Sequence, residues 1–222
     1  MAQQSDSAQL TAQQLETWER FGPTYAELAI SKDAAEPTSQ QMIAAISRHK
    51  QVADGKSAYI ASSSSVSVFV SKVLTCMFGL FGQETDFGPG VSLGSQFLDL
   101  ASSAGEPATP LAKAFPHVQV VSTDLSPTSV QLAATHARAS GLHNLRAEVA
   151  DAQDLSAYAD STFAVVTCSF GLMFMPDFKR ALHEMHRVLE QGGLVILTLL
   201  AEEARSENVQ VRYQLCINSI AQ

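Results

Sequence analysis

The sequence predicts an α/β protein whose core is a Rossmann-like, doubly wound parallel sheet. From Gln96 onward, short apolar runs alternate with segments of helical periodicity, which is typical of repeated β-α units. Hydrophobic residues make up 46% of the chain and charged residues only 16%, as in proteins whose strands are covered on both faces. At 222 residues, the chain is long enough for one well-buried core with an appendage.

Each β-α unit can be placed from its local pattern. Apolar runs predict strands, in order, at residues 97–100, 118–123, 145–149, 163–168 and 194–200. Capping and breaking residues predict helices from Pro107 to about Phe115, from the Ser126-Pro127 cap to Gly141, and from Asp177 to Gly192-Gly193. Apolar residues recur at i, i+3 and i+4 in the last helix: Phe178, Ala181, Leu182, Met185, Val188 and Leu189.

Three segments are expected along the chain. Residues 1–57 predict a helical N-terminal cap, with an amphipathic piece that includes Trp18 and Tyr25. Residues 58–95 are an atypical apolar insertion, rich in serine and glycine. Residues 96–222 hold the Rossmann-like core.

Composition and charge argue against several classes of partner. A formal net charge of −8 leaves no basic excess to neutralise a phosphate backbone, so we expect no nucleic-acid partner. Three cysteines are too few and too far apart for a disulfide framework or a metal site, which indicates a reducing compartment. The N-terminus shows neither a secretory nor a transit signal. These features predict a cytoplasmic location.

One stretch, residues 58–82, is long enough to span a bilayer. It contains a serine run, and Lys72 lies near its middle, where a charge is costly in lipid. Both features favour a covered segment of a soluble protein over a membrane span.

Candidate binding residues gather where the first two strands end. In a doubly wound sheet the ligand lies beyond the carboxyl ends of the strands. The turn at 99–106 is built of small residues that let the backbone approach a ligand closely. Asp124 ends the second strand, 25 positions after Asp99, where a carboxylate can accept both hydroxyls of a ribose. The alternative role for Asp124 is a helix cap, and the two roles can coexist.

The third and fourth strands end in further candidates. Asp151 and Ala152 follow the third strand, where a carboxylate could accept from the exocyclic amine of an adenine. A solvated loop acid is the alternative interpretation. The fourth strand ends at Cys168-Ser169-Phe170-Gly171, whose glycine would expose backbone toward a ligand.

The acids discriminate between cofactors. The pyrophosphate of a nicotinamide or flavin dinucleotide requires several glycines and a free helix N-terminus. The turn supplies only Gly105, and Asp99 and Glu106 flank it and would repel a diphosphate. S-adenosylmethionine (SAM) instead carries a sulfonium and an ammonium, which nearby carboxylates attract. The sequence therefore favours SAM.

Several motifs occur in the order and spacing of a known family. They are FLDLASSAG at 97–105, VSTDLS at 121–126, DAQDL at 151–155, SFGLMFMPD at 169–177 and RVLEQGG at 187–193. As a set they resemble the class I SAM-dependent methyltransferases. The stretch 163–197 looks most like the branch that contains the ubiquinone and menaquinone biosynthesis methyltransferases. The resemblance covers roughly residues 96–200.

The resemblance implies a role for each candidate. Those that would line the methionine part of SAM are Asp99, Ala101, Ser103 and Gly105. Those that would hold the ribose and adenine are Asp124, Leu125, Asp151 and Ala152, with Ser169 at the end of the fourth strand. Tyr25 belongs to a segment similar to the aromatic N-terminal segment that closes over the cofactor. No catalytic residue is assigned. If the acceptor required a base, Tyr25, His183 and His186 are the titratable candidates, although both histidines are expected on the solvated side of their helix.

The sequence departs from the family at the turn and after the fifth strand. Ala101 and Ser103 occupy positions where the family has glycine, so glycine at 103 is expected to strengthen SAM binding, and glycine at 101 to add to it if that position also needs a positive φ. The core is expected to be truncated after strand five of a 3-2-1-4-5 sheet, with that edge open or covered by residues 201–222. An open edge would favour self-association as a homo-oligomer.

Two functions from different classes follow. The first is a SAM-dependent methyltransferase that acts on a small-molecule acceptor. The alternative is a catalytically inert or incomplete methyltransferase-like protein that serves as a binding module. A nicotinamide-dependent oxidoreductase is disfavoured by the turn at 99–106.

Overall fold

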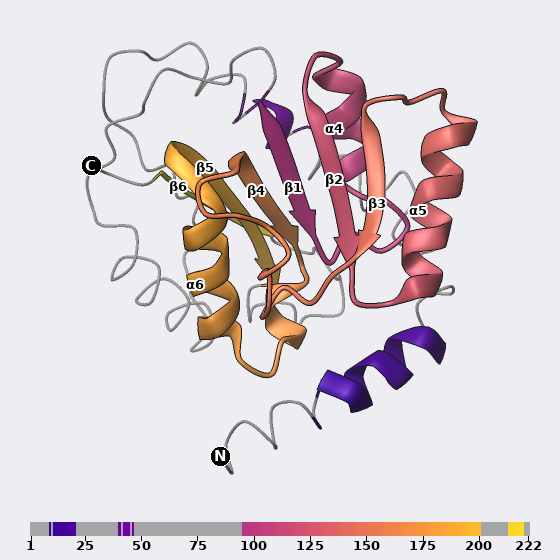
Figure 1. The fold of residues 1–222 in the computed structure, drawn as a ribbon, viewed down its shortest axis with the longest axis vertical. Helices are drawn as coiled ribbons and strands as arrows, with labels where there is room; N and C mark the ends of the chain where they lie inside the picture. The colour runs from indigo at the N-terminus through magenta and orange to yellow at the C-terminus, as the bar shows by residue number, and fades with distance from the viewer. Residues whose placement is uncertain are drawn as a thin grey trace, which may run out of the picture.

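The computed structural model describes residues 9, 11–20, 40, 42–44, 46, 95–200 and 213–219. Tyr25, the stretch 58–82 and nearly all of the segment 58–95 lie outside the described residues. The described strands form one six-stranded sheet in the order β3-β2-β1-β4-β5-β6 (Figure 1). They are β1 (Gln96–Leu100), β2 (Gln119–Asp124), β3 (Leu145–Val149), β4 (Phe163–Ser169), β5 (Leu189–Leu200) and β6 (Tyr213–Ser219). The first five are parallel, and the predicted order 3-2-1-4-5 is confirmed.

Helices connect the parallel strands close to the predicted positions. They are α4 (Ala108–Ala114), α5 (Pro127–Ala139), the short 3-10 helix η1 (Leu172–Phe174) and α6 (Phe178–Val188). The predicted caps form: the Ser126 hydroxyl accepts from the Ser129 N–H at 3.1 Å, and the Asp177 carboxylate accepts from the Arg180 N–H at 3.0 Å. Among the described residues, no helix has the length and apolar content needed to cross a bilayer.

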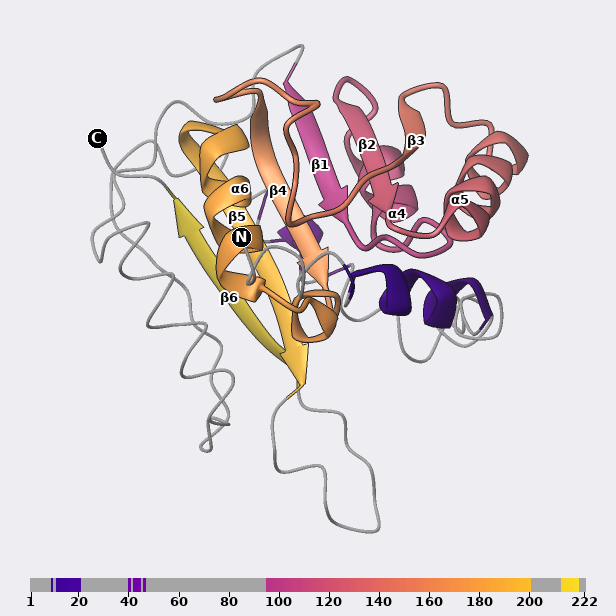
Figure 2. The ribbon, with the colours of Figure 1, turned by 60° about the horizontal axis from the view of Figure 1, so that its bottom comes forward.

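Helices α4 and α6 cover opposite faces of the sheet (Figures 1 and 2). Alternate residues of the central strands point to the two faces, and apolar side chains occur on both faces. On the α6 face the strand residues include Leu98, Leu100, Val166, Cys168, Val195 and Leu197. On the α4 face they include Phe97, Val120, Val165, Leu194 and Ile196, joined by Met42 and Ile46 from the N-terminal region. The doubly wound fold class is confirmed.

The junction between α6 and β5 differs from the sequence-based expectation. The helix ends at Val188, and Leu189 is already extended and pairs with Phe163 at the start of β5. Leu189 is buried, and an apolar side chain is equally suited to a buried strand and to the apolar face of a helix. Gly192, with a φ of +74°, lies within β5, where the pairing with β4 shifts register. The prediction that Gly192-Gly193 ends the helix is therefore wrong.

The expectation that the core is truncated after strand five is also wrong. Residues 213–219 form β6, which pairs antiparallel with β5 from Leu194 opposite Ser219 to Leu200 opposite Tyr213. This strand supplies partners for the backbone N–H and C=O groups along the outer edge of β5. The edge is covered from within residues 201–222, which was the second of the two predicted arrangements. The argument for self-association at this edge is thereby removed, and oligomeric state stays a prediction.

Candidate cofactor site

A pocket opens at the carboxyl ends of the parallel strands. It encloses about 700 Å³ of space when its open mouth is counted. The helical residues 11–20 lie beside this end of the sheet (Figure 2). The lining residues are Gln14, Trp18, Ala101, Ser103, Asp124, Leu125, Ser129, Ala150, Asp151, Ala152, Gln153, Ser169, Phe170, Gly171, Phe174 and Met175.

Most of the sequence-predicted site residues meet at this pocket. The candidates that line it are Ala101, Ser103, Asp124, Leu125, Asp151, Ala152 and Ser169. Asp99 and Gly105 lie behind the lining and do not reach it. Tyr25 lies outside the described residues. His183 is exposed on α6 and His186 is half-buried there, and neither lines the pocket.

The turn after β1 has the left-handed backbone for which glycine is suited. The φ angle is +54° at Ala101, +48° at Ser103 and +99° at Gly105. Two backbone donors tie this turn to β2. The Ser102 N–H donates to the Thr123 carbonyl at 2.8 Å, and the Ser103 N–H donates to a carboxylate oxygen of Asp124 at 2.8 Å. The turn thus keeps its shape although two of these three residues carry a Cβ.

Asp124 joins the turn to the next helix and also faces the pocket. Its Oδ2 accepts from the Ser103 N–H, and its Oδ1 accepts from the Ser126 N–H at 2.9 Å. Burial raises the pKa of this carboxyl, and the two backbone donors oppose that shift. A carboxylate has about four acceptor positions, so each oxygen keeps one for a ligand. The capping role and the ligand-facing role coexist at this residue.

Asp99 is a buried acid beneath the turn. Its side chain is 0% exposed, and its Oδ1 accepts from the Thr167 hydroxyl at 2.6 Å. Among the described residues, no group donates a hydrogen bond to its Oδ2. Desolvation raises the pKa of Asp99 to about 7, although the hydroxyls of Ser102 and Thr167 lower it. Asp99 therefore lies buried at the start of the turn, without direct access to the pocket.

Gln153 is a functional candidate that the sequence reasoning missed. It is only 5% exposed, and both its backbone N–H (2.9 Å) and its side-chain amide (3.1 Å) donate to the carboxylate of Asp151. Its Oε1 accepts from the Asp177 N–H at 2.8 Å, and its amide also donates to the Thr11 hydroxyl at 3.4 Å. It orients Asp151 and links this loop to two distant segments. Its place two residues after Asp151, in the motif DAQDL, was the one signal available.

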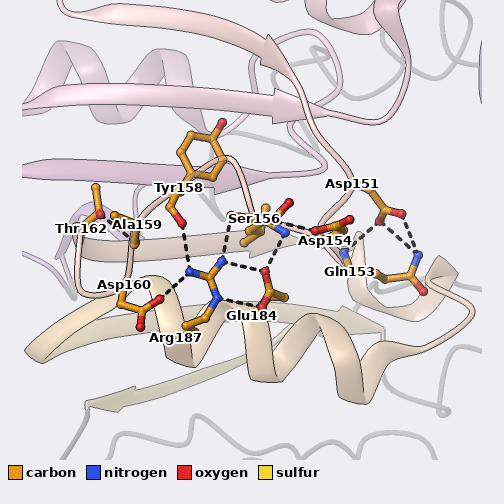
Figure 3. Close-up of polar contacts among 11 residues, drawn as sticks. Asp151, Gln153, Asp154, Ser156, Tyr158, Ala159, Asp160, Thr162, Glu184 and Arg187 are labelled. Carbon is orange, nitrogen blue, oxygen red and sulfur yellow. Dashed lines mark hydrogen bonds and ion pairs between the residues drawn. The ribbon is translucent and has the colours of Figure 1, made fainter.

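Helix α6 anchors the loop that carries Asp151 and Gln153 (Figure 3). Arg187 donates to the carbonyls of Leu155 and Tyr158 at 2.8 and 2.9 Å and to Asp160 at 2.7 Å. Glu184 accepts from Arg187 with both oxygens and from the Leu155 N–H at 2.7 Å. The loop between β3 and β4 is therefore fixed to the helix that follows β4.

The N-terminal helical residues close one side of the pocket. Trp18 packs edge-to-face on Phe174, with ring centroids 5.2 Å apart, and Gln14 donates a hydrogen bond to the Phe174 carbonyl. Glu19 accepts from the hydroxyls of Ser126 and Thr128 at the start of α5. These hydrogen bonds lower the pKa of Glu19. The contacts join segments more than 100 residues apart.

Fold and site together define a class of protein. A parallel sheet in the order 3-2-1-4-5, with one carboxylate at the end of β2, one after β3 and a tight turn after β1 around a shared pocket, is the arrangement that the resemblance to the class I SAM-dependent methyltransferases implies.

Comparison with known proteins agrees with this class. Residues 97–193 match the family described as methyltransferase domain. The demethylmenaquinone methyltransferase of Deinococcus radiodurans is 39% identical over 100 residues, which are 45% of this chain and 41% of that protein. The enzyme of the same name from Thermus thermophilus is 36% identical over 102 residues, 46% of each chain. The matched region is thus a class I methyltransferase domain related to demethylmenaquinone methyltransferases, as the motifs predicted.

A solved structure supports the fold over a longer part of the chain. The crystal structure of the [4+2]-cyclase SpnF aligns with a TM-score of 0.53 at 20% identity and covers 86% of this chain and 60% of that chain. At this identity the likeness concerns the fold alone. The match spans less than half the length of each of these two curated relatives.

Proposed function

We propose that this protein binds SAM and transfers its methyl group to a small-molecule acceptor. One observation carries the proposal. Asp124 and Asp151 face a strand-end pocket, and among its described lining residues there is no lysine, arginine or histidine. Such a pocket suits a ligand with net positive charge near its reactive centre, and it would repel a pyrophosphate.

The donors and acceptors of the pocket fit the parts of SAM. Asp124 has acceptor positions left for the two ribose hydroxyls, and Leu125 beside it offers an apolar surface for an adenine. Asp151, oriented by Gln153, would accept from the exocyclic amine, with Ala152 at the ring edge. The turn from Ala101 to Gly105, together with Ser169, would lie along the methionine part. Asp99 would act on this part only through the turn.

The bound cofactor would supply an electrophilic methyl group, and the chain supplies binding and orientation. The pocket walls hold the cofactor in one place, so the acceptor can approach the methyl group in line. Trp18 and Phe174 cover one side and exclude water there. No base lines the pocket among the described residues beyond the two carboxylates placed on the cofactor side. We therefore assign no proton-transfer step.

The acceptor class and the location are also part of the proposal. A small-molecule acceptor is supported by the two demethylmenaquinone methyltransferases, whose names state what they methylate. A partner other than nucleic acid is supported by the net charge of −8. A cytoplasmic location is supported by Cys168, which is a buried free thiol.

A turnover assay separates an enzyme from an inert binding module. The protein is incubated with SAM labelled on its methyl group and a panel of quinols, phenols and other small nucleophiles, and S-adenosylhomocysteine is measured. We expect acceptor-dependent formation of S-adenosylhomocysteine, slowed about tenfold or more by Asp124→Ala when SAM is subsaturating. Binding of SAM with no product from any acceptor would favour the non-catalytic alternative.

A further inference from the structure

The turn after β1 contains a side chain whose position depends on the loop after β4. Ala101 has a φ of +54°, which points its methyl group in a direction that few L residues adopt. This methyl group meets the loop at Gly171, at the entrance of η1. Both residues line the pocket.

The backbone conformation at position 171 does not require glycine. Its φ of −78° and ψ of −39° are right-handed helical values that any residue adopts. Glycine is required at 171 because neighbouring atoms leave no room for a Cβ. A Cβ at 171 would lie 2.4 Å from the Cβ of Ala101 and 3.0 Å from the Sγ of Cys168. Carbon atoms in proteins pack at about 3.5–4.0 Å, so a methyl group at 171 would displace Ala101 by about 1 Å.

We propose that Ala101 and Gly171 form an exchangeable pair in which Gly171 is a positioning residue for the cofactor turn. The methyl group of Ala101 occupies the space that a side chain at 171 would need, and one methyl group is all that the space accepts. This inference rests on the proposed function, because its consequence is the placement of the turn against SAM.

The connection from Gly171 to the cofactor runs through a short stretch of backbone. Ala101 lies two residues before Ser103, whose N–H donates to Asp124 at 2.8 Å. Ser102, between them, donates to Thr123 at 2.8 Å. A displacement of Ala101 by about 1 Å would strain both hydrogen bonds and move the Asp124 carboxylate, and misplacement on this scale is costly at a binding site. Gly171 would thus control the shape of the turn through Ala101, in addition to lining the pocket itself.

Four variants of the full chain test the pair: Gly171→Ala, Ala101→Gly, the double variant Ala101→Gly/Gly171→Ala, and Gly141→Ala. The last is the control, because a Cβ at 141 meets no atom within 4 Å, although the φ of +67° makes alanine strained there. For each variant, SAM affinity is measured by calorimetry and the melting temperature by circular dichroism.

We expect Gly171→Ala to weaken SAM binding by about tenfold or more and to lower the melting temperature by several degrees. The double variant, which moves the methyl group from 101 to 171, should recover most of both losses, because only the contact with the Cys168 Sγ at 3.0 Å remains tight. Gly141→Ala should lower the melting temperature without changing the affinity. Normal affinity in Gly171→Ala would overturn the positioning role even if that variant were less stable.

The two readouts keep this inference distinct from the proposed function. If the parent binds no SAM, the proposed function fails, but the melting temperatures still test the pair. The pairing of Ala101 with Gly171 would then be overturned if the double variant melted at no higher a temperature than Gly171→Ala. If Gly171→Ala does not fold, folding of the double variant supports the pair, and failure of both to fold contradicts it.

Discussion

At the scale of single residues, the acids of the site differ in how they are held. Asp124 receives two backbone hydrogen bonds and Asp151 is bonded to Gln153, so both are oriented before any ligand arrives. Asp99 is buried, with an Oδ2 that receives no hydrogen bond from the described residues. Only the first two acids line the pocket.

Asp124→Ala should therefore lose more SAM affinity than Asp177→Ala. The first change removes the acceptor for ribose hydroxyls, and hydrogen bonds to a charged group contribute about 1.5–3 kcal/mol, so a loss of roughly ten- to a hundredfold is expected. The second removes the α6 cap, worth about 1 kcal/mol of stability, and should leave the affinity unchanged. Calorimetric titration of both folded variants is the measurement. Equal affinities would refute the ribose assignment.

Ser103→Gly should strengthen SAM binding without destabilising the protein. Because Ser103 has a φ of +48°, glycine relieves backbone strain that offsets the extra entropy of the unfolded chain. The free energy of unfolding should stay constant or rise by up to about 1 kcal/mol. Urea unfolding and SAM titration check this. Ser140→Gly is the control, since Ser140 is exposed with a φ of −86°, and it should lose stability. A similar loss in Ser103→Gly would contradict the strain argument.

The sequence predicted those site residues that follow directly from strand ends. Asp124 and Asp151 could be placed because parallel strands bring their carboxyl ends together. Gln153, Phe174 and Gln14 could not, because their roles depend on contacts between segments far apart in the sequence. The pairing of Ala101 with Gly171 also depends on the exact approach of two loops.

At the scale of elements, helical segments hold the loops of the site in position through hydrogen bonds. The N-terminal helical residues hold the entrance of α5 through Glu19, and α6 holds the loop after β3 through Arg187. Each of these two contacts includes one charged side chain, Glu19 or Arg187, that can be changed alone.

Glu19→Gln should loosen the N-terminal helical residues from the pocket. The hydrogen bonds from Ser126 and Thr128 lower the pKa of Glu19, so their contribution is present above its ordinary pKa of 4.5 and is lost as the pH falls below 4.5 through the lowered value. The chain has one tryptophan, Trp18, whose emission reports this contact. We expect a red shift in the variant at pH 7 and in the parent under acid.

The effect of Glu19→Gln on SAM affinity should be modest, about two- to fivefold, because the carboxylate is exposed. Glu16→Gln, an exposed position on the same helical segment, serves as the control and should leave the emission unchanged. Identical Trp18 spectra for the Glu19 variant and the parent would show that this contact does not hold the segment.

Arg187→Lys should destabilise the loop after β3. Lysine cannot reproduce the planar fork that reaches two carbonyls and two carboxylates, so a loss of about 1–2 kcal/mol in the free energy of unfolding is expected. Arg180→Lys, at an exposed position on the same helix, should change it by less than about 0.5 kcal/mol. Urea denaturation compares them. Equal stabilities would mean that the network of Figure 3 contributes little.

At the scale of the whole molecule, the order of the five parallel strands was predictable and the last strand was not. Periodicity, caps and right-handed crossovers limit the possible topologies strongly. β6 follows a stretch outside the described residues. It supplies hydrogen-bond partners to the outer edge of β5, and the local sequence does not reveal this pairing. The start of β5 was misplaced because Leu189 fits a helical stripe and a buried strand equally well.

The lining of the pocket suits SAM and not a dinucleotide. Calorimetric titration of the full chain with SAM and, under the same conditions, with NADH tests it most directly. We expect saturable binding of SAM at one site, roughly tenfold or more tighter than any binding of NADH, because Asp124 and Asp151 attract the cationic cofactor and repel the pyrophosphate. Binding of NADH with no binding of SAM, or no binding of either, would contradict it.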